Sequence, residues 1–300
     1  MKLNADAPPC AGPDRAPRAP RQAVPPGAAD CHAHVFGDPR RFPFASPRAY
    51  TPPLCTTEDY LEMLDATGLR YGVVVQPSVY GQDNAALLDA LKRGNGRLRG
   101  IIDPAADDLE ASRLHELSDL GVRGIRINML ARGDVSGGEM RELAERLAPA
   151  GWHIDIIPDG IGRVAELAEI IPTLPVPVVI EQMGRIAGDQ SPEEPGFAAL
   201  CRLVAEEAAW VKLSHGYHIS AEGPPYADTL PFARALCEAG PTRLVWGSDW
   251  PHPMLDGPMP NDGALLDLLA DWAPDSALRR RILVDNPAAL YGFPDPFETA

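Results

Sequence analysis

The sequence predicts an α/β protein, and three of its features point to a (β/α)8 TIM barrel. Eight short runs rich in β-branched residues follow one another after residue 28. Longer stretches with helical periodicity separate most of these runs. The runs are almost continuously apolar, as expected for parallel strands that are buried on both faces. Eight such units between residues 29 and 293 fit one barrel, whose usual size is about 250 residues.

The expected strands, in chain order, span residues 29–36, 71–77, 97–103, 122–129, 152–158, 176–184, 210–216 and 243–250. Helical patterns cover 56–68, 84–96, 108–121, 137–151 and 228–240, with a short closing helix within 285–293. Thr57 is the expected N-cap of the first helix, and Gly68 its stop. An open doubly wound sheet is the rival architecture. Its nucleotide-binding form loses support because no Gly-x-Gly-x-x-Gly motif follows the first strand.

Composition limits the partners of this chain. The formal net charge of −15 argues against nucleic acid, whose binders concentrate lysine and arginine, but it allows a small anionic substrate. The five cysteines are scattered and form no Cys-x-x-Cys pair, which favours reduced thiols in a cytoplasmic enzyme. No apolar stretch has the length of a membrane span. The oligomeric state cannot be read from the sequence.

Residues 1–28 differ from the rest of the chain because they are rich in proline. They contain no continuous apolar segment and therefore do not resemble a signal peptide. We expect a disordered leader here, whose removal costs little stability. Residues 29–300 are expected to form a single domain.

Polar residues gather at the ends of the predicted strands, where a barrel places its active site. They are His32, His34, Gln76, Ser78, Asp103, Arg126, Asn128, Asp155, Glu181, Gln182, Ser214, His215 and Asp249. The preceding strand residues are mostly apolar, as an active-site mouth at one end of a barrel requires.

His32 and His34 stand two apart on the first strand, so both side chains point to one side. Asp30 is expected below them on that side, with Cys31 and Ala33 facing away. Two converging imidazoles suit a metal ion or a carbonyl oxygen that is to be polarised. The alternative is a pair of hydrogen-bonded core histidines, which the position on the first barrel strand disfavours. A Cys-His nucleophile is not expected, because Cys31 faces away.

Asp249 follows the last strand, which neighbours the first strand in a closed barrel. Trp246 and Trp250 are expected to wall its pocket and to raise its pKa by desolvation, toward the range of a general base. The alternative role is an N-cap for the following turn. His252 is interpreted as loop structure.

Arg126 ends the fourth strand and Arg132 lies in the loop after it. Each could offer a guanidinium fork to a carboxylate, either of the protein itself or of a substrate. Arg48, Tyr50 and Arg185 are further candidates in loops.

The ordered motifs "DCHAHVFG", "RGIRIN", "VPVVIEQMGR", "VKLS" and "WGSDWPHP" resemble the amidohydrolase superfamily, in particular its branch of pyrone-dicarboxylate and sugar lactonases. The resemblance covers residues 29 to about 292. It implies an amidohydrolase-type barrel with His32, His34 and Asp249 at its mouth, working without a divalent metal. It also implies that Arg126 and Arg132 hold substrate carboxylates, and that Tyr50 and Ser78 line the pocket.

Three positions depart from the family pattern. Glu181-Gln182 replaces Asp-His after the sixth strand, His218 replaces an arginine after the seventh, and Ile157 replaces a pocket tyrosine. Gln182 can donate to a carbonyl oxygen but is a poor metal ligand. We therefore expect no tightly bound cofactor; if a metal such as zinc binds weakly, its ligands are His32, His34 and Asp249.

These observations predict a hydrolase of small carboxylated lactones. Asp249 would be the general base, His32 and His34 would polarise the carbonyl, and Gln182 and His218 would contact the substrate. Alternatives are a lactone isomerase, a metal-dependent decarboxylase of the same superfamily, and a non-catalytic binding protein.

Overall fold

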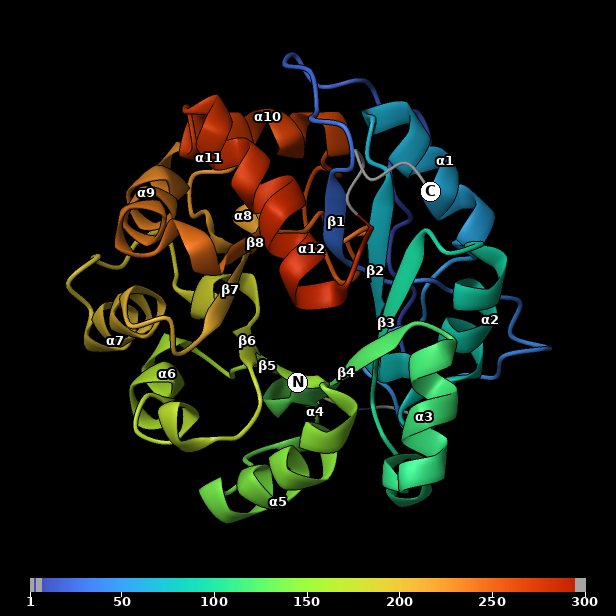
Figure 1. Cartoon of the computed structure of the whole chain (residues 1–300). Coiled ribbons are helices and arrows are strands. Elements are labelled where there is room, and N and C mark those ends of the chain that lie inside the picture. Colours follow the sequence, from blue (N-terminus) through green and yellow to red (C-terminus); the bar gives the residue numbers. More distant parts are fainter. Residues whose placement is uncertain (1–2, 4–6, 295–300) are drawn as a thin grey trace.

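The computed structural model describes residue 3 and residues 7–294, except for the side chain of Arg132. Eight parallel strands lie in sequence order and form a nearly closed barrel surrounded by helices (Figure 1). They are β1 (Ala29–Ala33), β2 (Tyr71–Val75), β3 (Leu98–Ile102), β4 (Val122–Asn128), β5 (His153–Ile157), β6 (Val178–Ile180), β7 (Trp210–Leu213) and β8 (Leu244–Trp246). The predicted TIM barrel and its eight strands are confirmed.

The main helices of the outer ring are α1 (Thr57–Thr67), α2 (Ala85–Arg93), α3 (Ala111–Asp119), α5 (Gly137–Leu147), α6 (Ile161–Leu167), α7 (Pro195–Ala205), α9 (Leu230–Ala239) and α10 (Asp262–Trp272). Shorter helices are α4 (Met129–Arg132), α8 (Gly216–Ile219), α11 (Ser276–Arg280) and α12 (Asn286–Tyr291). The sequence analysis did not identify α6, α7 and α10. The N-cap of α1 is Thr56, not Thr57, because the Thr56 hydroxyl accepts from the Asp59 N–H and the Asp59 carboxylate accepts from the Thr56 N–H.

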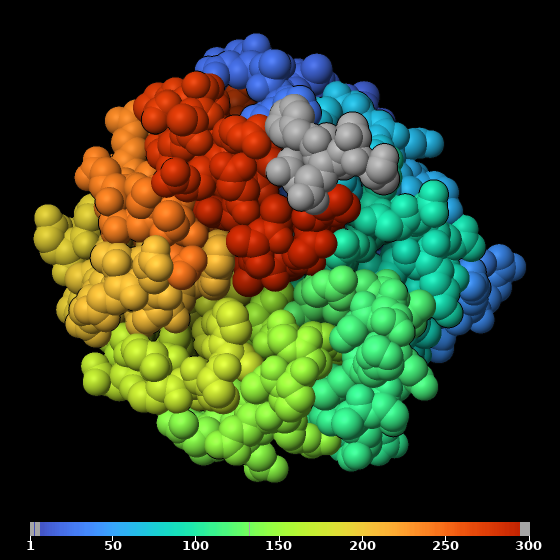
Figure 2. All heavy atoms as spheres, in the orientation of Figure 1, coloured from blue at the N-terminus to red at the C-terminus, as the bar shows by residue number. Residues whose placement is uncertain are grey.

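Two apolar layers hold the barrel together. The larger one lies between strands and helices, and the smaller one fills the barrel interior with side chains that include Val73, Val75, Val179 and Val245. Tyr291 of α12 belongs to the interior layer. α12 lies across one end of the barrel, and the space-filling view shows the C-terminal segment covering that face (Figures 1 and 2). The opposite end, at the carboxyl ends of the strands, carries the pocket described below.

The barrel closes between β1 and the chain that follows β8. The Asp249 N–H donates to the His32 carbonyl at 2.8 Å, and the His34 N–H donates to the Trp250 carbonyl at 2.7 Å. Gly247 permits this approach, because a Cβ there would lie 2.5 Å from the His32 Cβ. Closure therefore brings Asp249 beside the two histidines.

A bulge in β1 corrects part of the expected side-chain pattern. The pairing with β2 shifts register between Asp30 and Ala33. Asp30 consequently faces outward, where its carboxylate accepts from the Tyr60 hydroxyl at 3.0 Å, and Cys31 joins the interior layer. Asp30 does not lie below the histidines, and Cys31 does not face away from the interior. Burial raises the pKa of Cys31 well above its usual value, in keeping with an unreactive thiol.

Residues 7–28, which the sequence analysis interpreted as part of a disordered leader, contact the barrel at several points. This segment lies against α10, where Arg18 and Arg21 pair with the buried Asp267 at 2.5 and 3.1 Å. It also reaches α1, where Arg15 pairs with Asp59 at 2.8 Å. Backbone hydrogen bonds also hold the segment: the Cys10 N–H donates to the Thr51 carbonyl at 3.0 Å, and the Thr51 N–H donates to the Pro8 carbonyl at 2.7 Å.

Within the described residues, no helix has the length and apolarity that a membrane crossing requires.

Candidate active site

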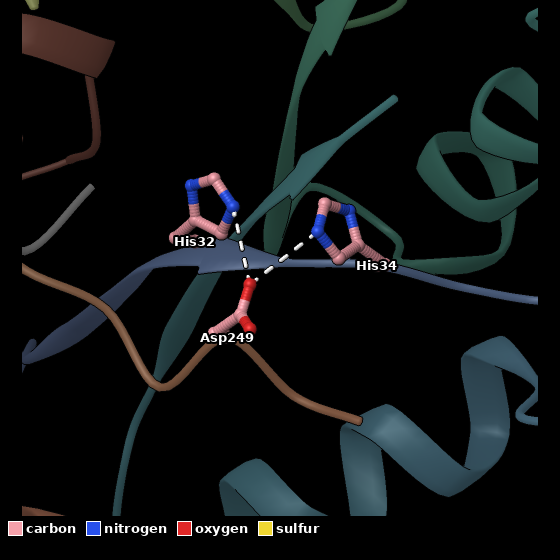
Figure 3. A group of neighbouring side chains, drawn as sticks. All are labelled: His32, His34 and Asp249. Carbon is pink, nitrogen blue, oxygen red and sulfur yellow. Dashed lines mark ion pairs between the residues drawn. The ribbon is translucent and has the colours of Figure 1, made fainter. Parts of the chain in front are cut away.

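His32, His34 and Asp249 converge at the mouth of the barrel (Figure 3). His32 belongs to β1, His34 follows the end of that strand, and Asp249 comes from the chain after β8. Asp249 Oδ1 lies 3.4 Å from His32 Nε2 and 3.4 Å from His34 Nε2. The three residues are at most 4% exposed. The structure thus brings together the three residues that the sequence analysis assigned to catalysis.

The second oxygen of Asp249 has partners from the segment after β7. The Tyr217 hydroxyl donates to Oδ2 at 2.6 Å, and His215 Nε2 lies 3.2 Å from the same atom. His215 and Asp249 have φ angles of 65° and 63°, in the left-handed region that non-glycine residues seldom adopt. The sequence analysis named His215 only as a polar strand end and missed Tyr217. No sequence pattern predicts that either side chain points toward Asp249, because the left-handed turn at His215 sets the direction of both.

The expected raised pKa of Asp249 was wrong. Burial raises the pKa of this carboxyl, but the neighbouring rings of His215 and His34 and the hydrogen bond from the Tyr217 hydroxyl outweigh burial and lower it below the usual value. The expected tryptophan walls are absent from the pocket lining: Trp246 packs in the outer layer, and Trp250 stacks on Tyr60 at 5.3 Å. Asp249 is therefore ionised at neutral pH.

Asp249 Oδ1 and His32 Nε2 are both buried, and neither makes a hydrogen bond of good geometry to any residue that the structure describes. Burial, followed by the charge of Lys212, lowers the pKa of His32 well below its usual value, so this ring is neutral. A buried acceptor and a buried imidazole nitrogen thus face each other, and Asp249, which carries the acceptor, lines the pocket. Such atoms are costly to bury unless a substrate or solvent molecule can bind them.

Arg126 reaches the site but is engaged by the protein. Its Nε and Nη2 donate to the two carboxylate oxygens of Glu181 at 3.2 and 2.7 Å, and its Nη1 donates to the Gln76 carbonyl at 3.1 Å. The sequence analysis left open whether Arg126 binds a carboxylate of the protein or of a substrate. The structure shows it bound to a protein carboxylate, that of Glu181. Glu181 is one of the positions that depart from the family pattern.

A pocket of about 360 Å³ opens above these residues. Its lining includes His34, Asp249 and His215. It also includes five of the six expected substrate contacts, which are Tyr50, Ser78, Arg126, Gln182 and His218. The sixth, Arg132, has its side chain outside the described part of the structure. Asn128, Ile157 and Arg185 complete the polar and apolar walls. Of these, Arg185 was only a loop candidate.

Arg185 lies beside Gln182 on the β6 side of this pocket. Its Nη1 donates to Gln182 Oε1 at 3.2 Å, and its other guanidinium donors have no hydrogen-bond partner among the residues that the structure describes. Gln182 and Arg185 have φ angles of 54° and 59°. The strained turn after β6 therefore directs an amide and a cation into the same pocket.

Beneath His32 lies a layer of buried polar groups in the barrel interior. Lys212 of β7 places Nζ 3.2 Å from His32 Nδ1 and 2.5 Å from Asp155 Oδ2. On its other side, Asp155 Oδ1 lies 3.3 Å from His153 Nε2. The sequence analysis assigned no role to Lys212 because it is in the middle of an apolar run.

His32, His34 and Asp249 offer ligand atoms within 4.8 Å of one another and could in principle hold a metal ion. His34 suits this role, because its Nδ1 lies 2.7 Å from the Val75 carbonyl and must carry the proton, which leaves Nε2 free. His32 does not suit it, because its Nδ1 faces the Lys212 amine. The Lys212 contact to His32 therefore argues against a three-ligand zinc centre at this set.

Comparison with known proteins places this geometry in context. The family model described as Amidohydrolase matches residues 29–293. A 4-sulfomuconolactone hydrolase of Rhizobium radiobacter is 42% identical over 95% of this chain and 96% of its own. A 2-pyrone-4,6-dicarboxylate hydrolase of Comamonas testosteroni is 37% identical over 92% of this chain and 93% of its own.

A solved structure from Acinetobacter baumannii has a similar fold. It is described as a probable 2-pyrone-4,6-dicarboxylic acid hydrolase with citric acid bound. It is 25% identical, with a TM-score of 0.80, over 89% of this chain and 100% of its own.

Proposed function

Since the chain belongs to the amidohydrolase family, we propose that it is a hydrolase that opens a small lactone bearing anionic groups. The observation that carries this proposal is the buried, unpartnered Oδ1 of Asp249, which faces His32 at the floor of the pocket. An ionised carboxylate beside hydrogen-bond donors is the arrangement that water activation and carbonyl polarisation require. The relatives named above supply the class of substrate, a lactone ring that carries carboxylate or sulfonate groups.

In the proposed mechanism, Asp249 Oδ1 takes a proton from a water molecule while the water oxygen attacks the lactone carbonyl. His32 Nε2–H donates to the carbonyl oxygen as its negative charge develops, an effect of about 3 kcal/mol for a well-placed donor. The tetrahedral intermediate then expels the ring oxygen, which receives the proton held by Asp249. Tyr217 and His215 hold the carboxylate in place through Oδ2.

The substrate's anionic group is proposed to bind on the β6 and β7 side of the pocket. Arg185 has free guanidinium donors there, and His218 lines the same wall. Arg126 uses all three of its nitrogens on protein acceptors, so we assign it to orienting the pocket wall through Glu181. Arg132 stays a proposed carboxylate ligand, and Tyr50, Ser78 and Gln182 proposed contacts to the ring.

No cofactor takes part in this mechanism. The five cysteines are free thiols, which favours a reducing compartment such as the cytoplasm, and a role in the breakdown of aromatic or sugar acids would follow from such a substrate.

The test is ring opening by chelator-treated protein. Wild type, Asp249→Asn and a control, Asp256→Asn on the exposed part of the same loop, are incubated with 2-pyrone-4,6-dicarboxylate and with 4-sulfomuconolactone. Loss of the ring is followed by absorbance and products by mass spectrometry. We expect wild type and control to add one water to the substrate, and Asp249→Asn to lose about 10³-fold in kcat.

Three results would contradict the proposal. They are near-native turnover by Asp249→Asn, a product of unchanged mass, and thermal stabilisation by a lactone that is never consumed. The second result would favour the isomerase and the third a binding protein.

A further inference from the structure

Lys212 is a fully buried lysine at the centre of the barrel, in the middle of β7. Lysine is almost never buried completely unless it is paired. Here the pair is Asp155, whose carboxylate lies against Nζ. Burial raises the pKa of Asp155, but Lys212 and His153 together outweigh burial and lower it. Lys212 and Asp155 therefore form an ion pair.

The remaining contact of this ammonium is the ring of His32. Nζ lies 3.2 Å from His32 Nδ1, and an ammonium group can donate but never accept a hydrogen bond. His32 Nδ1 must therefore present its lone pair to Lys212. In a neutral imidazole the proton then resides on Nε2, the atom that faces Asp249 and the pocket.

The other candidate partner of His32 Nδ1 is too distant to reverse this arrangement. Glu181 Oε1 lies 3.7 Å from Nδ1, beyond hydrogen-bond distance, and is committed to Arg126. His34 has the opposite arrangement, because the Val75 carbonyl fixes a proton on its Nδ1. The two histidines of one motif thus present the same nitrogen, Nε2, toward Asp249 but in different states: His32 offers a donor, and His34 offers a free lone pair whenever that ring is neutral.

We propose that Lys212 is a positioning residue that holds His32 in its Nε2–H tautomer, so that this ring donates to the lactone carbonyl oxygen instead of binding a metal ion. The proposal rests on the proposed lactone hydrolysis for its catalytic meaning, but the tautomer itself is independent of any substrate. Without the ammonium, Glu181 would become the nearest acceptor for Nδ1–H. Nε2 would then be free to complete a cation site with His34 and Asp249.

The first experiment measures the tautomer in the wild-type protein. Two-bond ¹H–¹⁵N correlation spectra of ¹⁵N-histidine-labelled protein distinguish the two neutral tautomers, and the His32→Gln variant assigns the signals. We expect the Nε2–H pattern for His32 and the Nδ1–H or doubly protonated pattern for His34. An Nδ1–H pattern for His32 would overturn the proposal, whether or not the protein hydrolyses any lactone.

The second experiment removes the lysine. Lys212→Met is combined with Asp155→Asn so that no buried charge is left alone. The matched control is Arg40→Met combined with Asp38→Asn, which removes an exposed ion pair and keeps the buried one. In the double variant we expect His32 to shift to Nδ1–H, and zinc affinity measured by calorimetry to rise about 10- to 100-fold over the control. A double variant that folds yet keeps the Nε2–H form would overturn the role of Lys212. If the double variant does not fold, the wild-type spectrum alone decides.

Steady-state kinetics separate a positioning role of Lys212 from a merely structural one, because a structural role would not lower kcat at constant KM. With an active lactone, the double variant should lose kcat while KM stays close to that of the control, because the carbonyl donor acts on the developing charge and not on ground-state binding. An equal kcat in the two variants would show that the tautomer does not serve catalysis.

Discussion

Asp249 and Glu181 are two buried carboxylates at the carboxyl ends of strands in the same barrel, yet their surroundings differ. Glu181, after β6, gives both oxygens to Arg126. Asp249, after β8, gives Oδ2 to Tyr217 and leaves Oδ1 without a hydrogen bond in the described structure. Burial alone therefore does not distinguish a structural carboxylate from one that can react; the difference is one unsatisfied oxygen that faces the pocket.

The largest effect expected from this comparison is on stability. Glu181→Gln removes the only carboxylate that pairs with the buried Arg126 among the described residues, and should lower the free energy of unfolding by about 3 kcal/mol. Urea unfolding measures the change. Arg126→Met with Glu181→Gln should recover much of the loss, because no charge is then left uncompensated. Asp249→Asn should cost far less, and the comparison would fail if it destabilised the protein more than Glu181→Gln.

An intermediate effect is expected at Arg185, whose guanidinium is mostly free to bind a substrate. Arg185→Met should raise KM for an anionic lactone about 10-fold, the loss of one charged hydrogen bond, with kcat nearly unchanged. Arg202→Met on the exposed face of α7 controls for the general loss of one positive charge. Equal KM values for the two variants would remove Arg185 from the binding site.

The sequence predicted the parts of the molecule that depend on local pattern. The apolar runs give the barrel, and the first and last strands of a closed barrel must meet, which brings His32, His34 and Asp249 together. The site details depend on features without a local pattern. The bulge that turns Asp30 outward, the left-handed turn at His215 and the Arg126–Glu181 pair each depend on backbone geometry or on a contact between distant strands.

The proline-rich leader shows the same limit in another region. Its composition is that of a disordered segment, but the buried Asp267 on α10 supplies a partner that composition cannot reveal.

The smallest effect on stability is expected in the leader, residues 7–28. Arg18→Ala should cost about 1 kcal/mol, since the arginine is half exposed while its partner Asp267 is buried. Arg40→Ala, which breaks an exposed pair with Asp38, is the matched control and should leave the melting temperature unchanged. If the two variants melt alike, the Arg18–Asp267 pair adds nothing to the stability of the barrel.

The seam of the barrel, where β1 meets the chain after β8, limits where this chain can accept insertions. The backbone N–H groups of His34 and Asp249 donate the hydrogen bonds that close the barrel between β1 and the chain after β8. The rate at which these two amides exchange with solvent deuterium therefore measures how often the seam opens. Because one of them belongs to Asp249, the same rate measures how firmly the reactive carboxylate is held in place. An insertion between Gly247 and Trp250 would part the seam and displace the carboxylate together. New specificities in this lineage should accordingly arise from the loops after β2, β4, β6 and β7, which border the pocket without closing the barrel.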